Sequence, residues 1–343
     1  MADCHDLFQG FNNRVRLTDA KRENLKEARD VLRNKITIHF SQNRPSYRPQ
    51  FQGQGSYVMD TIVNPIKWDY DLDDGVYFLG TASKENRPTP VSFHNWIIEA
   101  IGTHTDKVID KNTCVRVVYS AGFHIDLPIY YASYYSPELA HKRDGWILSN
   151  PIEFIVWFES KTNSGFKQEF LFEAARKEEF RTWAEDVRKK DVQLRRMVRY
   201  LKGWCDYKNG GMPSGIIMTI LAAGNYVPDQ RDDMSLYRTL EAIRASLKKE
   251  FVCRRPTTPK GEDLFAEYTV EQKSSFSKRL DDLIEDGKRA LNDSDKKNAC
   301  EKWKIHFGDR FPCHLVSTGP TIGAAIYEPL RDIAKTSTPW YRK

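Results

Sequence analysis

The stretch WDYDLDDGVYF, residues 68–78, places Asp71 and Asp73 two positions apart in a segment typical of a β-strand. Side chains alternate between the two faces of a strand, so these two carboxylates are expected on the same face. No basic residue lies between them to balance their charge. Hard oxygen ligands favour Mg²⁺ presented together with substrate phosphates, and the pair therefore predicts a metal site.

Two further features follow the order that such a site requires. Gly55 and Ser56, ahead of the pair, offer a flexible turn, backbone N–H groups and a hydroxyl, which suit an oligophosphate. A third carboxylate, Asp126, follows in FHIDLPIYY on the opposite strand face from Ile125 and Leu127. Each feature alone is usually only a turn or a surface residue. Together the three aspartates predict a two-metal nucleotidyltransferase centre.

The acids beside the pair are given other roles. Asp74 points to the opposite strand face and is interpreted as a turn or capping residue. Asp69 has the same parity as the pair but lies one step further back, so it is left out of the predicted site.

Six separated motifs resemble those of the bacterial cyclic-oligonucleotide synthases, the CD-NTases. They are GQGSYVMDTIVNP, YDLDDGVYF, HIDLPIY, YLKGWCDY, MPSGIIMTILA and HFGDRFP, and they extend from about Gln52 to Pro312. The resemblance is greatest to the cyclic GMP-AMP synthase branch, which is distantly similar to animal cGAS and to oligoadenylate synthase. It implies an α+β fold with a polymerase-β-like nucleotidyltransferase mixed sheet and helices, plus a C-terminal helical (OAS/PAP-like) lobe.

The resemblance also implies nucleotide-binding roles for residues outside the acidic set. Lys202 in YLKGW matches the family lysine that binds the triphosphate, and Ser214 in MPSGI matches the serine that contacts the same tail. Arg116 matches a position that meets the acceptor nucleotide. Asp263 lies where related synthases recognise a base. Gln54 is expected to touch the base or the phosphates, beside Gly55 and Ser56 in the predicted phosphate turn.

Ordinary structural roles stay open for several of these residues. Ser214 alone would be a helix cap, although a helix N-terminus is also an anion site. Arg116 could be a surface arginine on a strand. Arg195 and Arg199 share a helix face with Lys202, and that face is either functional or an ordinary solvated basic face.

The chain is long enough for two lobes. We expect residues 1–165 to form an N-terminal brace helix and the catalytic core, and residues 166–343 a mainly helical nucleotide-binding lobe. The predicted elements are a helix over 19–40 capped by Thr18 or Asp19, a helix near 94–103, a loop over 133–151 and a helix over about 270–292. The second lobe is expected to be mostly helical from about residue 167 onward, including a long charged helix through Leu201.

Composition is typical of a globular protein, with 40% hydrophobic and 12% aromatic residues. The longest apolar runs are far shorter than the ~20 residues of a membrane span, and the N-terminus has no signal-peptide core. We therefore expect a cytoplasmic, monomeric protein that binds no membrane, with operon-encoded regulators as candidate partners. A net charge of +6 from 53 basic and 47 acidic residues gives a mixed surface, so no nucleic acid is expected to be required.

Six scattered cysteines show no disulfide framework, and reduced thiols are expected. Cys300, His306, Cys313 and His314 lack the paired spacing of structural zinc sites and are interpreted as packing residues. The chain has neither the Gly-x-Gly-x-x-Gly of dinucleotide binding nor a phosphate loop ending in Gly-Lys-Ser/Thr, which disfavours dehydrogenases and P-loop kinases.

The resemblance implies a cyclic oligonucleotide synthase that joins NTPs and releases pyrophosphate. ATP and GTP are the expected substrates and cyclic GMP-AMP the expected product, a second messenger for anti-phage (CBASS) defence. Two Mg²⁺ ions per active site are expected, with Mn²⁺ as a substitute. Two alternatives stay open: a linear nucleotidyltransferase that tails RNA or modifies a small molecule, and a catalytically dead nucleotide-binding module, against which the three intact carboxylates argue.

Overall fold

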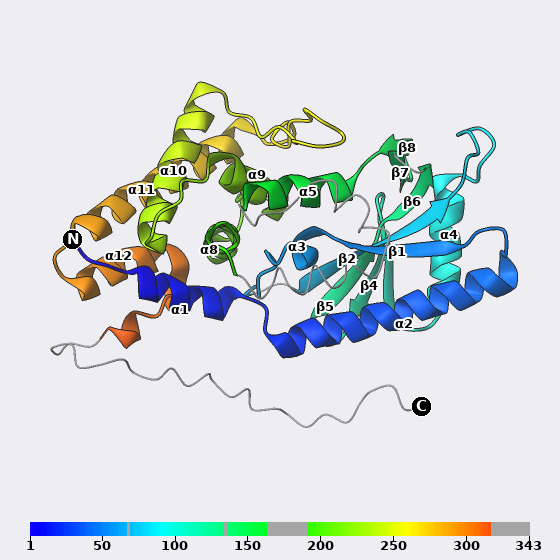
Figure 1. Cartoon of the computed structure of the whole chain (residues 1–343), viewed down its shortest axis with the longest axis horizontal. Coiled ribbons are helices and arrows are strands. Elements are labelled where there is room, and N and C mark those ends of the chain that lie inside the picture. Colours follow the sequence, from blue (N-terminus) through cyan, green and yellow to red (C-terminus); the bar gives the residue numbers. More distant parts are fainter. Residues whose placement is uncertain (67–68, 134–135, 163–190, 317–343) are drawn as a thin grey trace.

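The computed structural model describes residues 1–66, 69–133, 136–162 and 191–316. A mixed β-sheet with flanking helices lies at one end of the molecule and a helical bundle at the other (Figure 1). Within the described part of the chain, no helix is both long and apolar enough to cross a membrane.

The sheet is built around β2, which pairs with three other strands. The strands are β1 (Pro49–Gln54), β2 (Tyr70–Leu79), β3 (Lys107–Asp110), β4 (Val115–Tyr119), β5 (Phe123–Leu127), β6 (Ile129–Ser133), β7 (Ser136–His141) and β8 (Gly145–Leu148). Their order is β3-β4-β5-β2-β6-β7-β8, with β1 also paired to β2. Strand β2 runs parallel to β5 and β6 and antiparallel to β1, which confirms the predicted mixed sheet.

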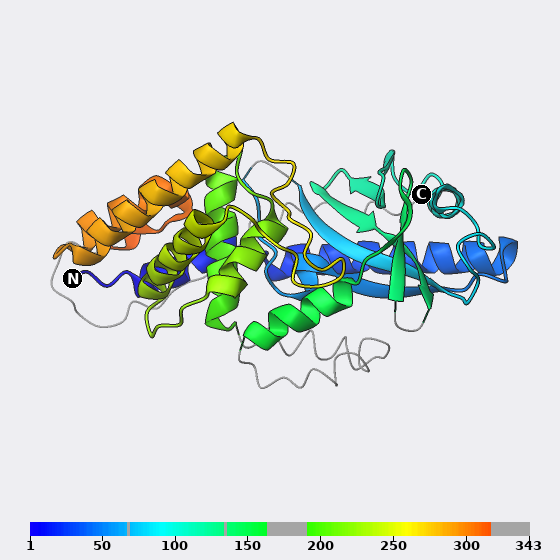
Figure 2. The same cartoon turned by 90° about the horizontal axis from the view of Figure 1, so that it is seen from above.

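The helices divide between the two ends of the molecule. Those next to the sheet are α2 (Asp19–Asn43), α3 (Gly55–Val58), α4 (Pro90–Ile101) and α5 (Pro151–Lys161). The bundle contains α1 (His5–Val15), α8 (Gln193–Lys208), α9 (Gly215–Asn225), α10 (Asp232–Lys249), α11 (Val270–Asn292) and α12 (Lys296–Phe307). A helical lobe was expected, and Figure 2 shows it from above.

Helix α2 confirms the first predicted helix and continues it to Asn43. The Thr18 hydroxyl caps it by accepting the Lys21 N–H, and its apolar stripe of Leu25, Ala28, Leu32 and Ile36 is buried. The stripe faces the sheet, because α2 contacts α4, β1 and β5. Helix α4 begins at Pro90, a few residues before the predicted start, and α11 has the predicted bounds.

Two elements differ from the sequence-based expectation. Strands β7 and β8 form an antiparallel hairpin inside the stretch that was predicted to be a loop. Its turn residues disguised it, yet Leu139 and Trp146 are buried, and Trp146 packs on the guanidinium of Arg87. Helix α1 was not predicted at all, although Phe8 and Phe11 pack at helical spacing against the bundle.

The predicted lobe boundary and part of a predicted helix lie outside the described residues. The division at residues 165 and 166 stays a prediction, because residues 163–190 are not described. The same holds for the helical structure predicted from about residue 167 to residue 190. The part that is described begins at Gln193 and continues past Leu201 to Lys208.

The expectation that all cysteines are reduced is wrong for one pair. Cys300 on α12 and Cys313 form a disulfide, with Cα atoms 5.6 Å apart. The short 3₁₀ helix after α12 turns the chain back, so that two residues 13 positions apart meet in the core. The two histidines suggested beside them have separate partners: His306 contacts Asp286 and His314 contacts Arg14.

Two buried aspartates join helices to the sheet end of the molecule. Asp60 follows α3, is fully buried and has a positive φ of 53°. Its carboxylate pairs with Arg16 after α1, Arg22 on α2 and Arg199 on α8, a group we call the Asp60 cluster. Asp74 on β2 is also fully buried and pairs with Arg33 of α2, so its assignment as a turn or capping residue is wrong.

Asp60→Ala should destabilise the protein strongly, because three arginines would lose one buried partner. Removing one member of a buried ionic group costs about 3–5 kcal/mol of unfolding free energy. Urea unfolding measures the effect. The control is Glu250→Ala, which breaks an exposed pair with Arg254 and should cost less than about 1 kcal/mol. Equal unfolding free energies for the two variants would contradict the role given to the Asp60 cluster.

Candidate active site

The three predicted aspartates lie on one face of the sheet. Strands β2 and β5 run parallel, and their register pairs Asp73 with Asp126 and Asp71 with His124. Paired residues on neighbouring strands point to the same face, and residues two apart on one strand do so too. Asp71 and Asp73 are half-buried and alternate with the buried Tyr70 and Leu72.

Burial and repulsion between these acids both act on the pKa of Asp73. Burial raises the pKa of the Asp73 carboxyl above its usual range, and the charges of Asp71 and Asp126 raise it further. Arg116 and Lys202 act in the opposite direction. A divalent cation would relieve this repulsion, and carboxylate oxygens are the ligands that Mg²⁺ prefers. The donor set of Asp71 and Asp73 therefore fits such an ion.

Asp126 has a different environment. Arg116 lies opposite it on β4, and its Nε and Nη2 donate to the two carboxylate oxygens at 2.7 Å each. The ammonium of Lys111 lies 3.8 Å from Asp126. In the part of the chain that the structure describes, no three acidic, His or Cys side chains converge into a preformed metal cluster. Arg116, predicted to meet the acceptor nucleotide, thus lies within the acidic face.

Gly55 allows the turn at α3 to approach the acidic face closely. Its φ is +63°, and a Cβ at this position would lie 2.2 Å from Oδ2 of Asp73. The carbonyl of Ser56 accepts hydrogen bonds from the N–H groups of Thr61 and Ile62, at 2.9 and 3.1 Å. The predicted phosphate turn is therefore next to Asp73, and it is hydrogen-bonded to the segment that follows Asp60.

Gln54 lies on the same face but its side chain is already engaged. It is 4% exposed, and its Nε2 donates to the Tyr77 hydroxyl at 3.1 Å. The Tyr130 hydroxyl donates to its Oε1 at 3.2 Å, and the two tyrosine rings stack. Contact between Gln54 and a base or phosphate, as predicted, would require these hydrogen bonds to break.

Helix α8 holds the segment after the phosphate turn through three cations. Arg195 donates to the carbonyl of Met59, Arg199 to that of Asp60, and Lys202 to that of Thr61. Arg195 and Arg199 are 1% and 0% exposed, so the solvated basic face is ruled out. Burial lowers the pKa of Lys202 to about 8, although Asp71 and Asp73 are close enough to oppose that shift.

Lys202 also lies beside the N-terminus of α9. A Cβ on Gly215 would be 3.3 Å from Cε of Lys202. Ser214 is the N-cap residue of α9, but its side chain makes no capping hydrogen bond. The first N–H groups of a helix lack intrahelical partners and attract anions. Lys202, Ser214 and the α9 N-terminus therefore offer positive charge and donors to a phosphate chain.

Asp263 is used to shape a loop. Its Oδ1 accepts the backbone N–H groups of Cys253 and Phe265 at 2.9 and 3.0 Å. The loop between α10 and α11 extends toward the sheet end of the molecule (Figure 2), where the Thr258 N–H donates to Glu153 on α5. The predicted contact between Asp263 and a base stays a prediction.

One residue on the acidic face was missed by sequence reasoning. His124 precedes Asp126 by two positions and faces Asp71 across β2 and β5. Its side chain is buried, and burial followed by the charge of Arg116 lowers the pKa of its imidazole. The parity of HID in FHIDLPIYY was the signal that could have found it.

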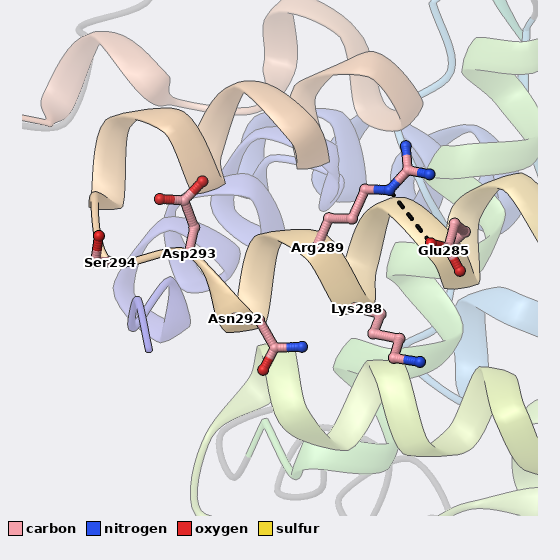
Figure 3. Close-up of a pocket in the computed structure, with 6 residues that line it drawn as sticks. All are labelled: Glu285, Lys288, Arg289, Asn292, Asp293 and Ser294. Carbon is pink, nitrogen blue, oxygen red and sulfur yellow. Dashed lines mark ion pairs between the residues drawn. The ribbon is translucent and has the colours of Figure 1, made fainter.

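A separate depression of about 500 Å³ lies near the C-terminal end of α11 (Figure 3). It is lined by Glu285, Lys288, Arg289, Asn292, Asp293 and Ser294. Glu285 and Arg289 pair with each other there. None of the predicted site residues lines it, and we assign it no part in the site.

Gly55→Ala should weaken binding of Mn²⁺, used as a probe for Mg²⁺, because the added methyl group must displace the Asp73 carboxylate. Losing the support of a metal ligand weakens affinity about tenfold or more. Titration followed by electron paramagnetic resonance measures it. Gly145→Ala is the matched control, with a φ of +77° and open space around the added Cβ. The interpretation fails if both variants bind Mn²⁺ as the wild type does.

Comparisons with known proteins show what this arrangement is similar to. Residues 49–130 match the model of the "Cyclic GMP-AMP synthase DncV-like, nucleotidyltransferase domain". A cyclic GMP-AMP synthase of Escherichia albertii is 24% identical over 73% of this chain and 50% of its own length. A c-di-GMP synthase of Roseivirga ehrenbergii is 28% identical over 60% of this chain and 55% of its own length. The chain thus spans about half the length of these curated relatives.

A solved structure of Vibrio cholerae DncV, described as a cyclic AMP-GMP synthase in complex with the linear intermediate 5′ pppA(3′,5′)pG, shares the fold. Its TM-score is 0.69 at 18% identity, over 91% of this chain and 98% of that chain. This likeness confirms the predicted nucleotidyltransferase sheet with a helical lobe. Residues 49–130 are therefore similar to the DncV-like nucleotidyltransferase domain, and the fold as a whole is similar to that of DncV.

Proposed function

We propose that this protein is a nucleotidyltransferase that joins two purine NTPs into a cyclic dinucleotide, with ATP and GTP as substrates and cyclic GMP-AMP as product. One observation carries the proposal: Asp71, Asp73 and Asp126 share a sheet face that meets Lys202 and the N-terminus of α9. An acidic face suits cations, and the adjoining basic corner suits a triphosphate. A nucleotidyl transfer needs both.

Mg²⁺ is the proposed cofactor, with Asp71 and Asp73 as ligands and Asp126 joining them for a second ion. When bound, the metal neutralises phosphate charge and lowers the pKa of the attacking ribose hydroxyl. Arg116, which holds both oxygens of Asp126, is the proposed contact for the acceptor nucleotide. Two ions in the site, with Mn²⁺ as a substitute, remain part of the proposal.

The remaining residues of the site position the donor nucleotide. Lys202, Ser214 and Ser56 are proposed to hold its β- and γ-phosphates, so that the α-phosphorus faces the acidic pair. The acceptor hydroxyl oxygen then forms a bond to that phosphorus, and the bond to the β-phosphate oxygen breaks, releasing pyrophosphate. A second attack of the same kind closes the ring. The linear intermediate described in the DncV complex supports a two-step order.

Features beyond the reaction are also part of the proposal. One relative is a c-di-GMP synthase, which supports a cyclic dinucleotide of purines without deciding which two purines it contains. A linear transferase would use the same acidic face. The expected role in anti-phage signalling, the cytoplasmic location, the monomeric state and activity without nucleic acid are also proposed.

Asp71→Asn combined with Asp73→Asn should abolish product formation from radiolabelled NTPs and Mg²⁺. Loss of metal stabilisation should lower turnover about a thousandfold or more. The melting temperature without Mg²⁺ should hold or rise, because a repulsive pair is neutralised. Asp69→Asn is the control, an exposed acid of the same strand parity that should keep full turnover. Near wild-type turnover in the double variant would refute the proposed site.

A further inference from the structure

The tyrosine that ends the loop between α10 and α11 lies against the proposed triphosphate site. The backbone N–H of Ser214 donates to the hydroxyl oxygen of Tyr268 at 3.3 Å. Tyr268 is half-buried and packs against the core of the bundle. Tyr268 and Ser214, the N-cap residue of α9, are 54 residues apart in the sequence. No sequence motif linked the two.

The loop is built to keep Tyr268 in place. Asp263 accepts the N–H of Phe265, and the Phe265 ring packs edge-on against Tyr268 with ring centres 5.1 Å apart. The N–H of Tyr268 also donates to the carbonyl of Phe265 at 3.0 Å. The carboxylate of Asp263 thus supports Tyr268 indirectly, through Phe265.

The other side of Ser214 needs an anchor as well. Asn209, Gly210 and Gly211 have φ values of 51°, 41° and 72°, and no atoms lie within 4 Å of a Cβ placed on either glycine. Arg279 of α11 holds this open turn by donating to the carbonyls of Asn209 and Gly210 at 2.9 and 3.0 Å. Arg279 therefore holds the turn that precedes Ser214, and Tyr268 accepts the N–H of Ser214 itself.

The hydroxyl of Tyr268 can also donate a hydrogen bond to a ligand while it accepts the one from Ser214. A phenol both accepts and donates a hydrogen bond, whereas a backbone N–H only donates. The oxygen of Tyr268 must therefore be the acceptor toward Ser214. Its own proton can then be given to another acceptor, and the adjacent Lys202 and α9 N-terminus attract anions.

We propose that Tyr268 is a further binding residue of the triphosphate site, where its oxygen fixes Ser214 and its O–H donates to the β- or γ-phosphate of the donor nucleotide. The inference rests on the proposed function, because it needs a triphosphate at the N-terminus of α9. It makes Tyr268 a residue that distinguishes nucleoside triphosphates from monophosphates.

Calorimetric titration with a non-hydrolysable ATP analogue and with AMP, in the presence of Mg²⁺, tests the inference. Tyr268→Phe removes one oxygen atom and should weaken binding of the ATP analogue roughly threefold to tenfold. Affinity for AMP should not change, since AMP lacks the β- and γ-phosphates.

Tyr237→Phe is the matched control, because its hydroxyl donates to Glu241 on the same helix, α10. It should bind the ATP analogue and AMP as the wild type does. The inference is overturned if Tyr268→Phe keeps wild-type affinity for the analogue, or loses affinity for AMP to the same extent. A wild-type protein that binds the analogue no better than AMP would refute the triphosphate site itself, and with it the inference.

Discussion

The buried carboxylate of Asp60 is the contact on which the arrangement of the site depends. Arg16, Arg22 and Arg199 approach it from three separate parts of the fold, and its own backbone continues directly from the phosphate turn. Arginine suits this place because its guanidinium stays charged and donates in several directions at once. Losing any one of these partners would leave buried charge unpaired, which is strongly unfavourable.

The same contact aligns the two halves of the proposed site. Asp60 is held by α8, and the carbonyl of the next residue, Thr61, accepts a hydrogen bond from the ammonium of Lys202. The N–H of Thr61 in turn donates to the carbonyl of Ser56. The acidic pair on β2 then faces a cation presented by the helical bundle. Repulsion among the acids and burial of the lysine are both unfavourable when the site is considered alone. A metal ion with a triphosphate would satisfy both, which is why the two features support one function.

Local periodicity predicted the parts of the fold in which one face is plainly apolar. Helix α2 and the alternation around Asp71 and Asp73 were predicted for that reason. The β7–β8 hairpin was missed because of its turn residues, and α1 was missed although its buried Leu7, Phe8, Phe11 and Val15 recur at helical spacing. The burial of Arg195 and Arg199, the Arg33 partner of Asp74 and the Cys300–Cys313 bond depend on chain segments distant in sequence. A single sequence cannot show such pairings.

The chemical identity of the product tests the account most directly. The pure protein would be incubated with ATP, GTP and Mg²⁺, treated with phosphatase, and its products separated by chromatography and identified by mass spectrometry. A ring has no terminal phosphate, so the account predicts a phosphatase-resistant dinucleotide with one adenosine, one guanosine and the mass of cyclic GMP-AMP. A product set made only of linear chains, or of rings without a purine, would contradict it.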